Sequence, residues 1–313
     1  AEVRPPQVHP PVSSPVLELR DVTLRYKKRT VLHRISLAAA KGEVIGVVGH
    51  NGAGKTTFSR ALCGLHKDCE GQFLWDGQTM ERKNRLKHSY MVMQDVNYEL
   101  FAESVEAECS FGIRNPDLTL AASTLEELGL APYRERHPNT LSGGQKQLLN
   151  LASIMAMQPS VLILDEPTSQ LDPIAAADFL ATLGKINREL GTTVVLTEHR
   201  LEDAFPLASR VAVMDRGRLL CTGSPAEVGA ILRGAGHSMF LAMPTPMRIW
   251  ASAPDAGGHC PVTVREGRDW LTGFADGHPL GELPAESRHV YPDEPAITAE
   301  GLWFKYEKEL PDV

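Results

Sequence analysis

The sequence predicts an α/β fold with a mixed sheet, and two kinds of segment carry that prediction. Apolar stretches at 43–48, 161–164 and 193–197 are nearly continuous, as in parallel strands that are covered on both faces. The stretch 174–190 has apolar residues at helical spacing and ends before Gly191. Strands and helices that alternate in this way build an α/β sheet.

Two further segments predict antiparallel additions to this sheet. Residues 17–26 alternate apolar and polar side chains with period two, which is typical of a half-buried antiparallel strand. Residues 211–214 and 219–220 flank a short turn at 215–218 that contains a glycine, so we expect a hairpin there. We therefore expect an antiparallel β subdomain beside the mixed sheet.

A helical subdomain is expected at about 95–158. Helix-forming segments such as 119–130 interrupt the alternation of strands and helices, and a further helix is expected over 145–158. The whole domain is expected to span 16–240.

The chain on either side of this domain has a different composition. Residues 1–15 contain five prolines and are expected to be an extended linker. Residues 241–295 are rich in Pro, Gly and His and are expected to be an interdomain linker with one short helix, which opens at Thr263 with a capping-box pattern. Residues 296–313 contain a stretch similar to 17–26, so we expect the truncated start of a second domain, and a chain that is a fragment.

Composition and charge exclude several classes of partner. The net charge of −7, with 39 acidic and 32 basic residues, gives no broad attraction for nucleic acid, and the basic run 82–88 is expected to be a solvated loop. The five cysteines form no CxxC pair, so they do not indicate a zinc site or a redox dithiol. Their odd number and scattered positions favour a reducing compartment. No apolar run reaches the roughly 18–20 residues of a membrane helix. We expect no nucleic-acid partner and a chain that does not itself cross a membrane.

The strongest motif is a phosphate-binding loop. The sequence GHNGAGKTT follows the apolar stretch 43–48 and precedes an apolar-periodic helix, a context that a simple glycine-rich turn does not explain. Glycines let backbone N–H groups surround a phosphate chain, Lys55 neutralises the β and γ oxygens, and the Thr56 hydroxyl can hold Mg²⁺. We expect a nucleoside triphosphate to bind at Gly49, His50, Asn51, Gly52, Ala53, Gly54, Lys55, Thr56 and Thr57.

Two adjacent acids follow the apolar stretch 161–164, at the edge where open α/β sheets bind ligands. We expect Asp165 to reach the Mg²⁺ shell and Glu166 to polarise or deprotonate the attacking water. Acids in this place can also cap a helix, but Pro167 follows and a phosphate loop is present. The pair therefore indicates hydrolysis of the triphosphate rather than binding alone.

Two more polar residues follow apolar strands. His199 ends the strand at 193–197, so in a parallel sheet it emerges at the same edge as Asp165 and can contact a γ-phosphate. Gln94 follows 91–93, and its amide can bind Mg²⁺ or water. Taken alone, each has an equally simple structural explanation: a solvated histidine and the start of a loop.

Taken together, these motifs resemble the ATP-binding-cassette (ABC) ATPases in order and spacing, over about residues 16–240. The resemblance implies a P-loop NTPase fold, with ATP and Mg²⁺ bound. It makes Glu166, His199, Gln94 and Asp172 the catalytic residues and Thr56, Gln94 and Asp165 the metal ligands. In the family's terms the motifs are the Walker A loop (49–57), the Q-loop (Gln94), the signature LSGGQ (141–145), Walker B (Asp165 and Glu166), the D-loop (Asp172) and the switch histidine (His199), with Tyr26 where an aromatic ring stacks on adenine.

The resemblance also implies that two such domains enclose two ATP molecules head to tail, the Walker A loop of one facing the signature of the other. The second domain would be a tandem copy or a second chain. Ser142 and the N–H groups of Gly143 and Gly144, followed by Gln145, precede a helix and so offer donors to a γ-phosphate. The signature is therefore expected to complete a neighbour's site.

A closer resemblance is to the tandem ATPases of energy-coupling-factor importers of vitamins and cobalt. It rests on MVMQDVNYELFAESVEAE (91–108), DEPTSQLDP (165–173) and TEHRLED (197–203). It implies a peripheral ATPase subunit on the cytoplasmic face of the cell membrane, whose helical subdomain docks an integral membrane partner.

Two alternatives to the transport subunit stay open. One is a soluble cassette ATPase that acts on ribosomes or DNA, although the long basic linker or coiled-coil insertion usual in such proteins is absent from the sequence. The other is a binding module that needs the neighbouring domain for activity.

The resemblance is not uniform along the chain. Residues 91–108 are similar to the second ATPase half of these tandem proteins, whereas the later segments are similar to a first half. We hypothesise that two halves are joined near LSGGQKQ, residues 141–147. Leu148 stands where the family often has Arg, and Gln170 replaces a small residue of the D-loop; neither change removes a catalytic group.

Overall fold

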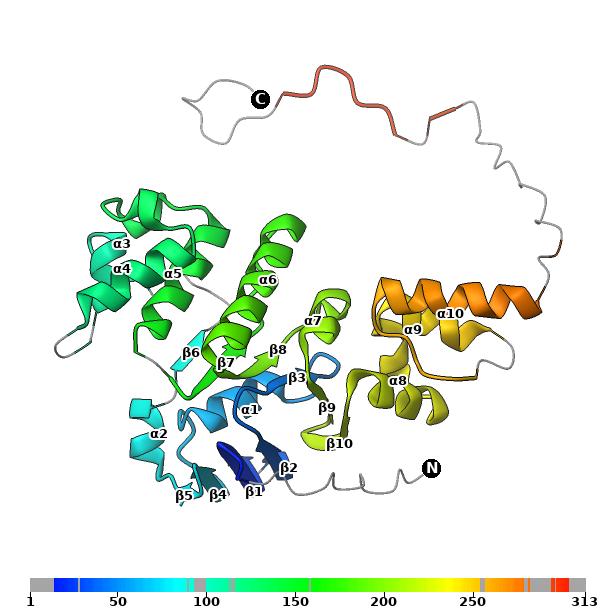
Figure 1. The fold of residues 1–313 in the computed structure, drawn as a ribbon, viewed down its shortest axis with the longest axis horizontal. Coiled ribbons are helices and arrows are strands. Elements are labelled where there is room, and N and C mark those ends of the chain that lie inside the picture. Colours follow the sequence, from blue (N-terminus) through cyan, green and yellow to red (C-terminus); the bar gives the residue numbers. More distant parts are fainter. Residues whose placement is uncertain are drawn as a thin grey trace. The chain divides into compact units, whose positions relative to one another are not determined.

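The computed structural model divides into two units, Ala1–Gly273 and Phe274–Val313, which are considered separately. In the second unit, the ring of Phe274 stacks on His278 with 3.9 Å between centroids. Residues 297–303 form neither helix nor strand. The described residues are 14–27, 29–88, 90–92, 100–111, 113, 116–157, 159–253, 257–278, 281, 294–295 and 297–303 (Figure 1).

The centre of the first unit is a mixed sheet, which has six strands among the described residues. They are β3 (Val44–Val48), β6 (Tyr90–Val92), β7 (Val161–Asp165), β8 (Thr193–Thr197), β9 (Arg210–Asp215) and β10 (Arg218–Gly223). Their order in space is β10-β9-β3-β8-β7-β6 (Figure 1). β10 returns antiparallel to β9 in the expected hairpin, and the other neighbours run parallel. Strands β3, β7 and β8 are buried along their whole length, which explains their continuous apolar sequences.

Helices cover both faces of this sheet. Helix α1 (Lys55–Leu62) shares one hydrophobic cluster with Val161 and Ile163, whereas helices α5 (Gly143–Met155) and α6 (Pro173–Leu190) share another with Leu162 and Leu164. Successive side chains of a strand point to opposite faces, so β7 lies between these two layers. Within the described part of the chain, no helix combines the length and the apolar character needed to cross a membrane.

A separate antiparallel sheet forms the expected β subdomain. It consists of β1 (Leu17–Tyr26), β2 (Arg29–Ala39), β4 (Cys69–Trp75) and β5 (Gln78–Thr79), in the order β2-β1-β4-β5. Leu17, Leu19, Val22 and Leu24 are buried, in the same cluster as α1. The period of two is interrupted at Asp21, whose φ of 50° accompanies a shift of register between Leu19 and Val22.

The helical subdomain includes α3 (Val105–Ser110), α4 (Leu118–Glu127) and α5, with 3-10 turns at Ala131–Tyr133 and Pro138–Thr140. The helix expected at 119–130 ends at Glu127. Two residues later, Gly129 takes a left-handed conformation (φ 70°), which is typical of a helix end. The helix expected from 145 already begins at Gly143, because Ser142 caps it.

The basic run expected to be a solvated loop is instead helix α2 (Arg82–His88). Arg85 is only 3% exposed, and its guanidinium carbon lies 3.4 Å from the centroid of the Phe73 ring. Stacking of a planar cation on an aromatic ring lets the arginine be buried, and a count of charges does not reveal such a contact.

The packed domain continues beyond residue 240, where a linker was expected. Met243, Met247, Trp250 and Cys260 are buried in one cluster with side chains of α7 (Leu201–Leu207) and α8 (Pro225–Gly234). These residues belong to or flank a 3-10 turn (Ser238–Ala242), α9 (Thr245–Ser252) and α10 (Val264–Gly277). The overall Pro and Gly content of the segment concealed a few well-spaced apolar side chains. The capping box expected at Thr263 is confirmed, since Thr263 and Glu266 exchange hydrogen bonds of 3.1 and 3.2 Å.

Candidate active site

The phosphate-binding loop joins β3 to α1, as predicted. Gly49 has to be glycine, because a Cβ there would lie 2.3 Å from the Met214 carbonyl oxygen. Gly52 and Gly54 have left-handed backbones (φ 80° and 103°), and Gly54 directly precedes Lys55, the first residue of α1. Only glycine adopts such conformations at little cost, so the sequence allows a tight loop at a helix N-terminus, where an anion is favoured.

A cleft of about 550 Å³ opens beside this loop. It brings the loop together with residues that follow β7 and β8, and so places Glu166 and His199 beside the phosphate-binding residues. Ser169 also lines the cleft, although the sequence analysis did not select it; its Oγ donates to the Glu166 carbonyl oxygen at 2.8 Å. The lining residues are Asn51, Gly52, Gly54, Lys55, Thr56, Thr57, Glu166, Ser169 and His199.

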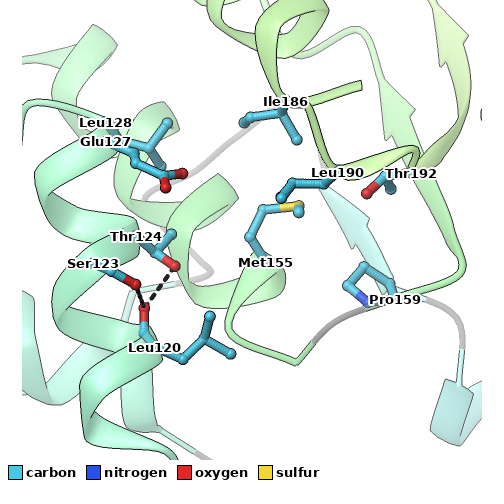
Figure 2. Close-up of a pocket in the computed structure, with 10 residues that line it drawn as sticks. All are labelled: Leu120, Ser123, Thr124, Glu127, Leu128, Met155, Pro159, Ile186, Leu190 and Thr192. Carbon is cyan, nitrogen blue, oxygen red and sulfur yellow. Dashed lines mark hydrogen bonds between the residues drawn. The ribbon is translucent and has the colours of Figure 1, made fainter. Parts of the chain in front are cut away.

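A second hollow, of about 280 Å³, lies between α4, the end of α5 and the end of α6 (Figure 2). Apolar side chains such as Leu120 and Met155 line much of it, and none of the predicted site residues within the described ranges does. Ser123 and Thr124 also line it, and both hydroxyls donate to the Leu120 carbonyl oxygen, at 2.9 and 2.8 Å, so they are engaged within α4. The convergent polar groups are therefore in the first cleft.

Lys55 is buried at the floor of the first cleft. Its Nζ donates to the Gly49 carbonyl oxygen at 3.0 Å and lies 3.8 Å from Glu166 Oε1. Burial lowers the pKa of Lys55, and the charges of Glu166, Asp165 and Glu198 oppose this shift. The ammonium is thus held by backbone and carboxylate groups and directed at the loop that is expected to take the phosphates.

Asp165, Thr56 and Thr197 form a cluster of oxygen atoms beneath the loop. Asp165 Oδ1 accepts from Thr197 Oγ1 at 2.7 Å and from Thr56 Oγ1 at 3.3 Å. Burial raises the pKa of Asp165, and these two hydrogen bonds oppose the shift. A hydroxyl and a carboxylate are the hard oxygen donors that Mg²⁺ prefers, so the predicted ligands Thr56 and Asp165 fit that ion.

Glu166 and His199 meet at the mouth of the cleft. Glu166 Oε1 lies 2.8 Å from His199 Nε2, although the two residues come from different strand ends. The Glu166 backbone is left-handed (φ 51°), which is costly for a residue with a side chain. Its N–H donates to both the carbonyl and the hydroxyl oxygen of Thr197, at 3.0 Å each, and these bonds hold the unusual conformation. A carboxylate fixed in this way can accept a proton from water, and the imidazole beside it can contact an anion.

Tyr26 lies at the end of β1 and is 64% exposed, so its ring is free to stack on a planar group.

Gly217, in the turn between β9 and β10, contacts both the phosphate-binding loop and β2. Its N–H donates to the Ala53 carbonyl oxygen, and its own carbonyl accepts from His33 N–H, both at 2.8 Å. A Cβ on Gly217 would lie 2.0 Å from the Val31 carbonyl oxygen. The sequence pattern predicts only a hairpin turn at this glycine and carries no signal of its contact with the loop.

His50 contacts a segment that the sequence analysis did not connect with the site. Its Nε2 lies 3.0 Å from Ser238 Oγ, and its ring stacks with His237 at 6.0 Å between centroids. The His50 side chain therefore faces the 3-10 turn that follows α8, while its backbone stays in the phosphate-binding loop.

The signature residues do not line the cleft of their own chain. Ser142 is exposed and its Oγ accepts from Gln145 N–H at 3.3 Å, while Gln145 Oε1 accepts from Ser142 N–H at 3.0 Å. Gly143 and Gly144 are the first two residues of α5. This capping box ends the helix at an exposed N-terminus that does not line the cleft beside the chain's own phosphate-binding loop.

Of the predicted catalytic residues, Asp172 does not line the cleft, and Gln94 cannot be placed. Asp172 is exposed and caps α6, with Oδ1 accepting from the N–H groups of Ile174 and Ala175 at 2.9 Å each. Gln94 lies outside the described residues.

Comparison with known proteins identifies the fold and the family. The family described as ABC transporter matches residues 32–169. An ABC transporter ATP-binding protein of Bacillus anthracis is 36% identical over 310 residues, which cover 94% of this chain and 55% of that protein. The energy-coupling factor transporter ATP-binding protein EcfA1 of Symbiobacterium thermophilum is 40% identical over 212 residues, covering 64% of this chain and 74% of its own length.

A solved structure agrees with these relatives. CbiO1 of Clostridium perfringens, described as part of the ABC transporter complex cbiONQ, has a TM-score of 0.65 and 28% identity, over 74% of this chain and 98% of that one. The chain spans about half the length of the relatives that it matches almost throughout (52–55%). It belongs to the family of ABC transporter ATP-binding proteins, and it carries an ATP-binding cassette, a domain that hydrolyses ATP.

Proposed function

We propose that the chain is the ATP-hydrolysing subunit of an importer of the energy-coupling-factor type. Its similarity to EcfA1 and to CbiO1 of the cbiONQ complex supports this proposal. The imported solute would be a vitamin or a metal ion such as cobalt. The relatives compared are transporter proteins, so the comparisons do not favour the alternative of an ATPase that acts on ribosomes or DNA.

The proposed chemistry follows from the cleft. The phosphate-binding loop and Lys55 hold the β- and γ-phosphates, and Tyr26 stacks on the adenine. Mg²⁺, held by Thr56 and Asp165 with Gln94, would neutralise charge on the phosphate oxygens. Glu166 accepts the proton of the attacking water, and His199 contacts the γ-phosphate.

One observation carries this proposal above the others. Glu166 Oε1 lies 2.8 Å from His199 Nε2 and 3.8 Å from Lys55 Nζ, within the cleft that the phosphate-binding loop lines. A base, a phosphate contact and a cation thus converge where a γ-phosphate would lie, which is the arrangement that hydrolysis needs.

We propose further that two cassettes pair head to tail, with Asp172 at the junction. The exposed capping box at Ser142 supports this, since it offers a helix N-terminus that the chain's own cleft does not use. The membrane partner would dock on the helical subdomain, which would place the chain on the cytoplasmic membrane face.

Complementation between two inactive variants tests the pairing. Lys55→Ala removes the phosphate contact, and Gly143→Asp puts a carboxylate at the signature, where a new Cβ meets only Leu171 Cδ2 at 3.7 Å and so should not disturb the fold. In a head-to-tail dimer, a mixed pair keeps one intact site. An equal mixture should then recover about a quarter of wild-type turnover, since half the dimers are mixed and each has one of two sites.

The control and the contradicting result are simple. Gly143→Asn adds a side chain of the same size and shape as that of Gly143→Asp without the charge and should be less damaging. If both variants fold, bind as dimers and stay inactive when mixed, the head-to-tail pairing is wrong. For the transport role, the tagged chain should co-purify with an integral membrane protein from detergent extracts.

A further inference from the structure

Glu198 has no assigned role, yet its side chain is more fully bonded than that of any residue in the cleft described above. It stands between the end of β8 and His199, and it is 3% exposed. Its Oε1 accepts from the N–H (3.1 Å) and the hydroxyl of Thr168. Its Oε2 accepts from the N–H groups of His199 (2.8 Å) and Arg200 (3.2 Å). Four donors thus converge on one buried carboxylate.

These bonds connect the two loops that carry the reacting groups. Thr168 lies two residues after Glu166, in the loop that follows β7, whereas His199 and Arg200 follow β8. A second bond joins the same loops, because Arg200 Nη2 donates to the Leu171 carbonyl oxygen at 3.1 Å. Hydrogen bonds of Glu198 and Arg200 thus join the loop that carries Glu166 to the loop that carries His199.

The Glu198 carboxylate does not itself line the cleft, so it cannot touch the reacting atoms directly. All its partners are donors, and three of them are backbone N–H groups, which can only donate. A side chain at this position therefore needs two oxygen atoms that both accept hydrogen bonds. An acid on the surface would be neither buried nor surrounded by donors in this way.

We propose that Glu198 is a positioning residue, which clamps the loop after β7 to the loop after β8 and so fixes Glu166 against His199 for hydrolysis. This inference rests on the proposed role of the cleft in ATP hydrolysis. It assigns Glu198 mainly to the turnover step, because none of its hydrogen-bond partners belongs to the phosphate-binding loop; its one link to that loop is the charge that it shares with Glu166 and Asp165 around Lys55.

The first test is Glu198→Gln in the full chain. The amide has the same shape, but its NH₂ group must face either Thr168 N–H or the N–H groups of His199 and Arg200, and two donors then oppose each other. Displacement of a reacting group by such a change costs roughly 10- to 100-fold in kcat. The dissociation constant for ATP should change less than about threefold. Glu189→Gln, which removes a charge from an exposed i,i+4 pair on α6, is the control and should leave kcat unchanged.

A second pair of variants tests the clamp without altering its charge. Thr168→Val removes the hydroxyl donor and keeps the size, so it should also lower kcat, whereas Thr168→Ser keeps the hydroxyl and should be close to wild type. Combined with Glu198→Gln, Thr168→Val should add little, because both variants break the same connection. If Glu198→Gln does not fold, the kcat values of Thr168→Val and Thr168→Ser still test the clamp.

A readout without nucleotide separates this inference from the proposed function. The ¹⁵N resonances of the His199 ring should shift in Glu198→Gln and Thr168→Val, but not in Thr168→Ser or Glu189→Gln. Absence of hydrolysis in the wild-type chain, with or without a partner cassette, would contradict the proposed function. Normal kcat and unshifted His199 resonances in Glu198→Gln and Thr168→Val would overturn the clamp.

Discussion

The Nε2 atom of His199 lies 2.8 Å from Oε1 of Glu166, although the two residues are 33 positions apart along the chain. The cause is the register of two parallel strands, in which Asp165 of β7 stands beside Thr197 of β8. The residues that follow each strand then emerge side by side at one edge of the sheet. The strand pairing therefore brings together the proposed base and the proposed phosphate contact.

Asp165→Asn should stabilise the nucleotide-free protein while abolishing the benefit of Mg²⁺. The amide oxygen can still accept from the hydroxyls of Thr56 and Thr197, so both hydrogen bonds are kept. The charge that burial disfavours is removed. We expect a melting temperature a few degrees higher at neutral pH, and ATP binding that no longer responds to Mg²⁺.

The sign of the pH dependence follows from the raised pKa of Asp165. The carboxyl favours folding at pH values below its ordinary pKa, and this contribution is lost as the pH rises through the raised value. The stability advantage of Asp165→Asn should therefore grow with pH and vanish in acid. Asp172→Asn, at an exposed cap where Asn serves equally well, is the control and should show little change. A variant less stable than wild type at neutral pH would contradict this account of Asp165.

Gly217→Ala should destabilise the domain and weaken ATP binding together. The new Cβ would lie 2.0 Å from the Val31 carbonyl oxygen, so the turn that connects the phosphate-binding loop to β2 has to move. We expect a loss of more than about 2 kcal/mol in the free energy of unfolding, from strain at a position that only glycine fits. Chemical denaturation and nucleotide titration measure the two effects.

Gly77→Ala is the matched control for this prediction. Gly77 has nearly the same φ (75° against 73°), but a Cβ there meets nothing within 4 Å. It should cost only about 1 kcal/mol, the ordinary penalty of a left-handed alanine, and leave ATP binding unchanged. Equal effects of the two variants would show that the contact of Gly217 with its neighbours does not matter.

Trp250→Ala should destabilise the domain strongly, because Trp250 belongs to the packed cluster of α7, α8 and α9. The side chain is 5% exposed, and Arg233 lies over its ring at 4.4 Å. We expect a loss of about 3–5 kcal/mol in the free energy of unfolding. Leu241→Ala, at a site 78% exposed in the same segment, should change it by less than about 0.5 kcal/mol. If the cassette were to end near residue 240, both variants would be neutral.

The sequence was enough to predict the strands of the mixed sheet, but not β2, β4 or β5 of the antiparallel sheet. Runs such as 161–164 are apolar throughout because both faces of β7 are covered, and a strand end in a parallel sheet has a known place. Contacts between distant segments left no such periodic signal. Arg85 on Phe73, Gly217 beneath Ala53, and Glu198 across two loops all depend on tertiary packing of single side chains.

The limit of the domain was also poorly predicted, for a similar physical reason. Between 241 and 260, Met243, Met247 and Trp250 are spaced for short turns of helix within a stretch whose Pro and Gly content resembles that of a linker. The joining of two ATPase halves near 141–147 remains a hypothesis. Sequencing reads that run unbroken across this stretch in one source DNA molecule would argue against it.

Glu166→Gln is the sharpest test of the proposal that Glu166 accepts the proton of the attacking water in the cleft. The amide keeps the size of the side chain and cannot act as a base, so phosphate release should fall by about 100-fold or more. ATP binding by the same variant should be retained, because Lys55 and the phosphate-binding loop are intact. Turnover equal to that of the wild-type chain would contradict the account.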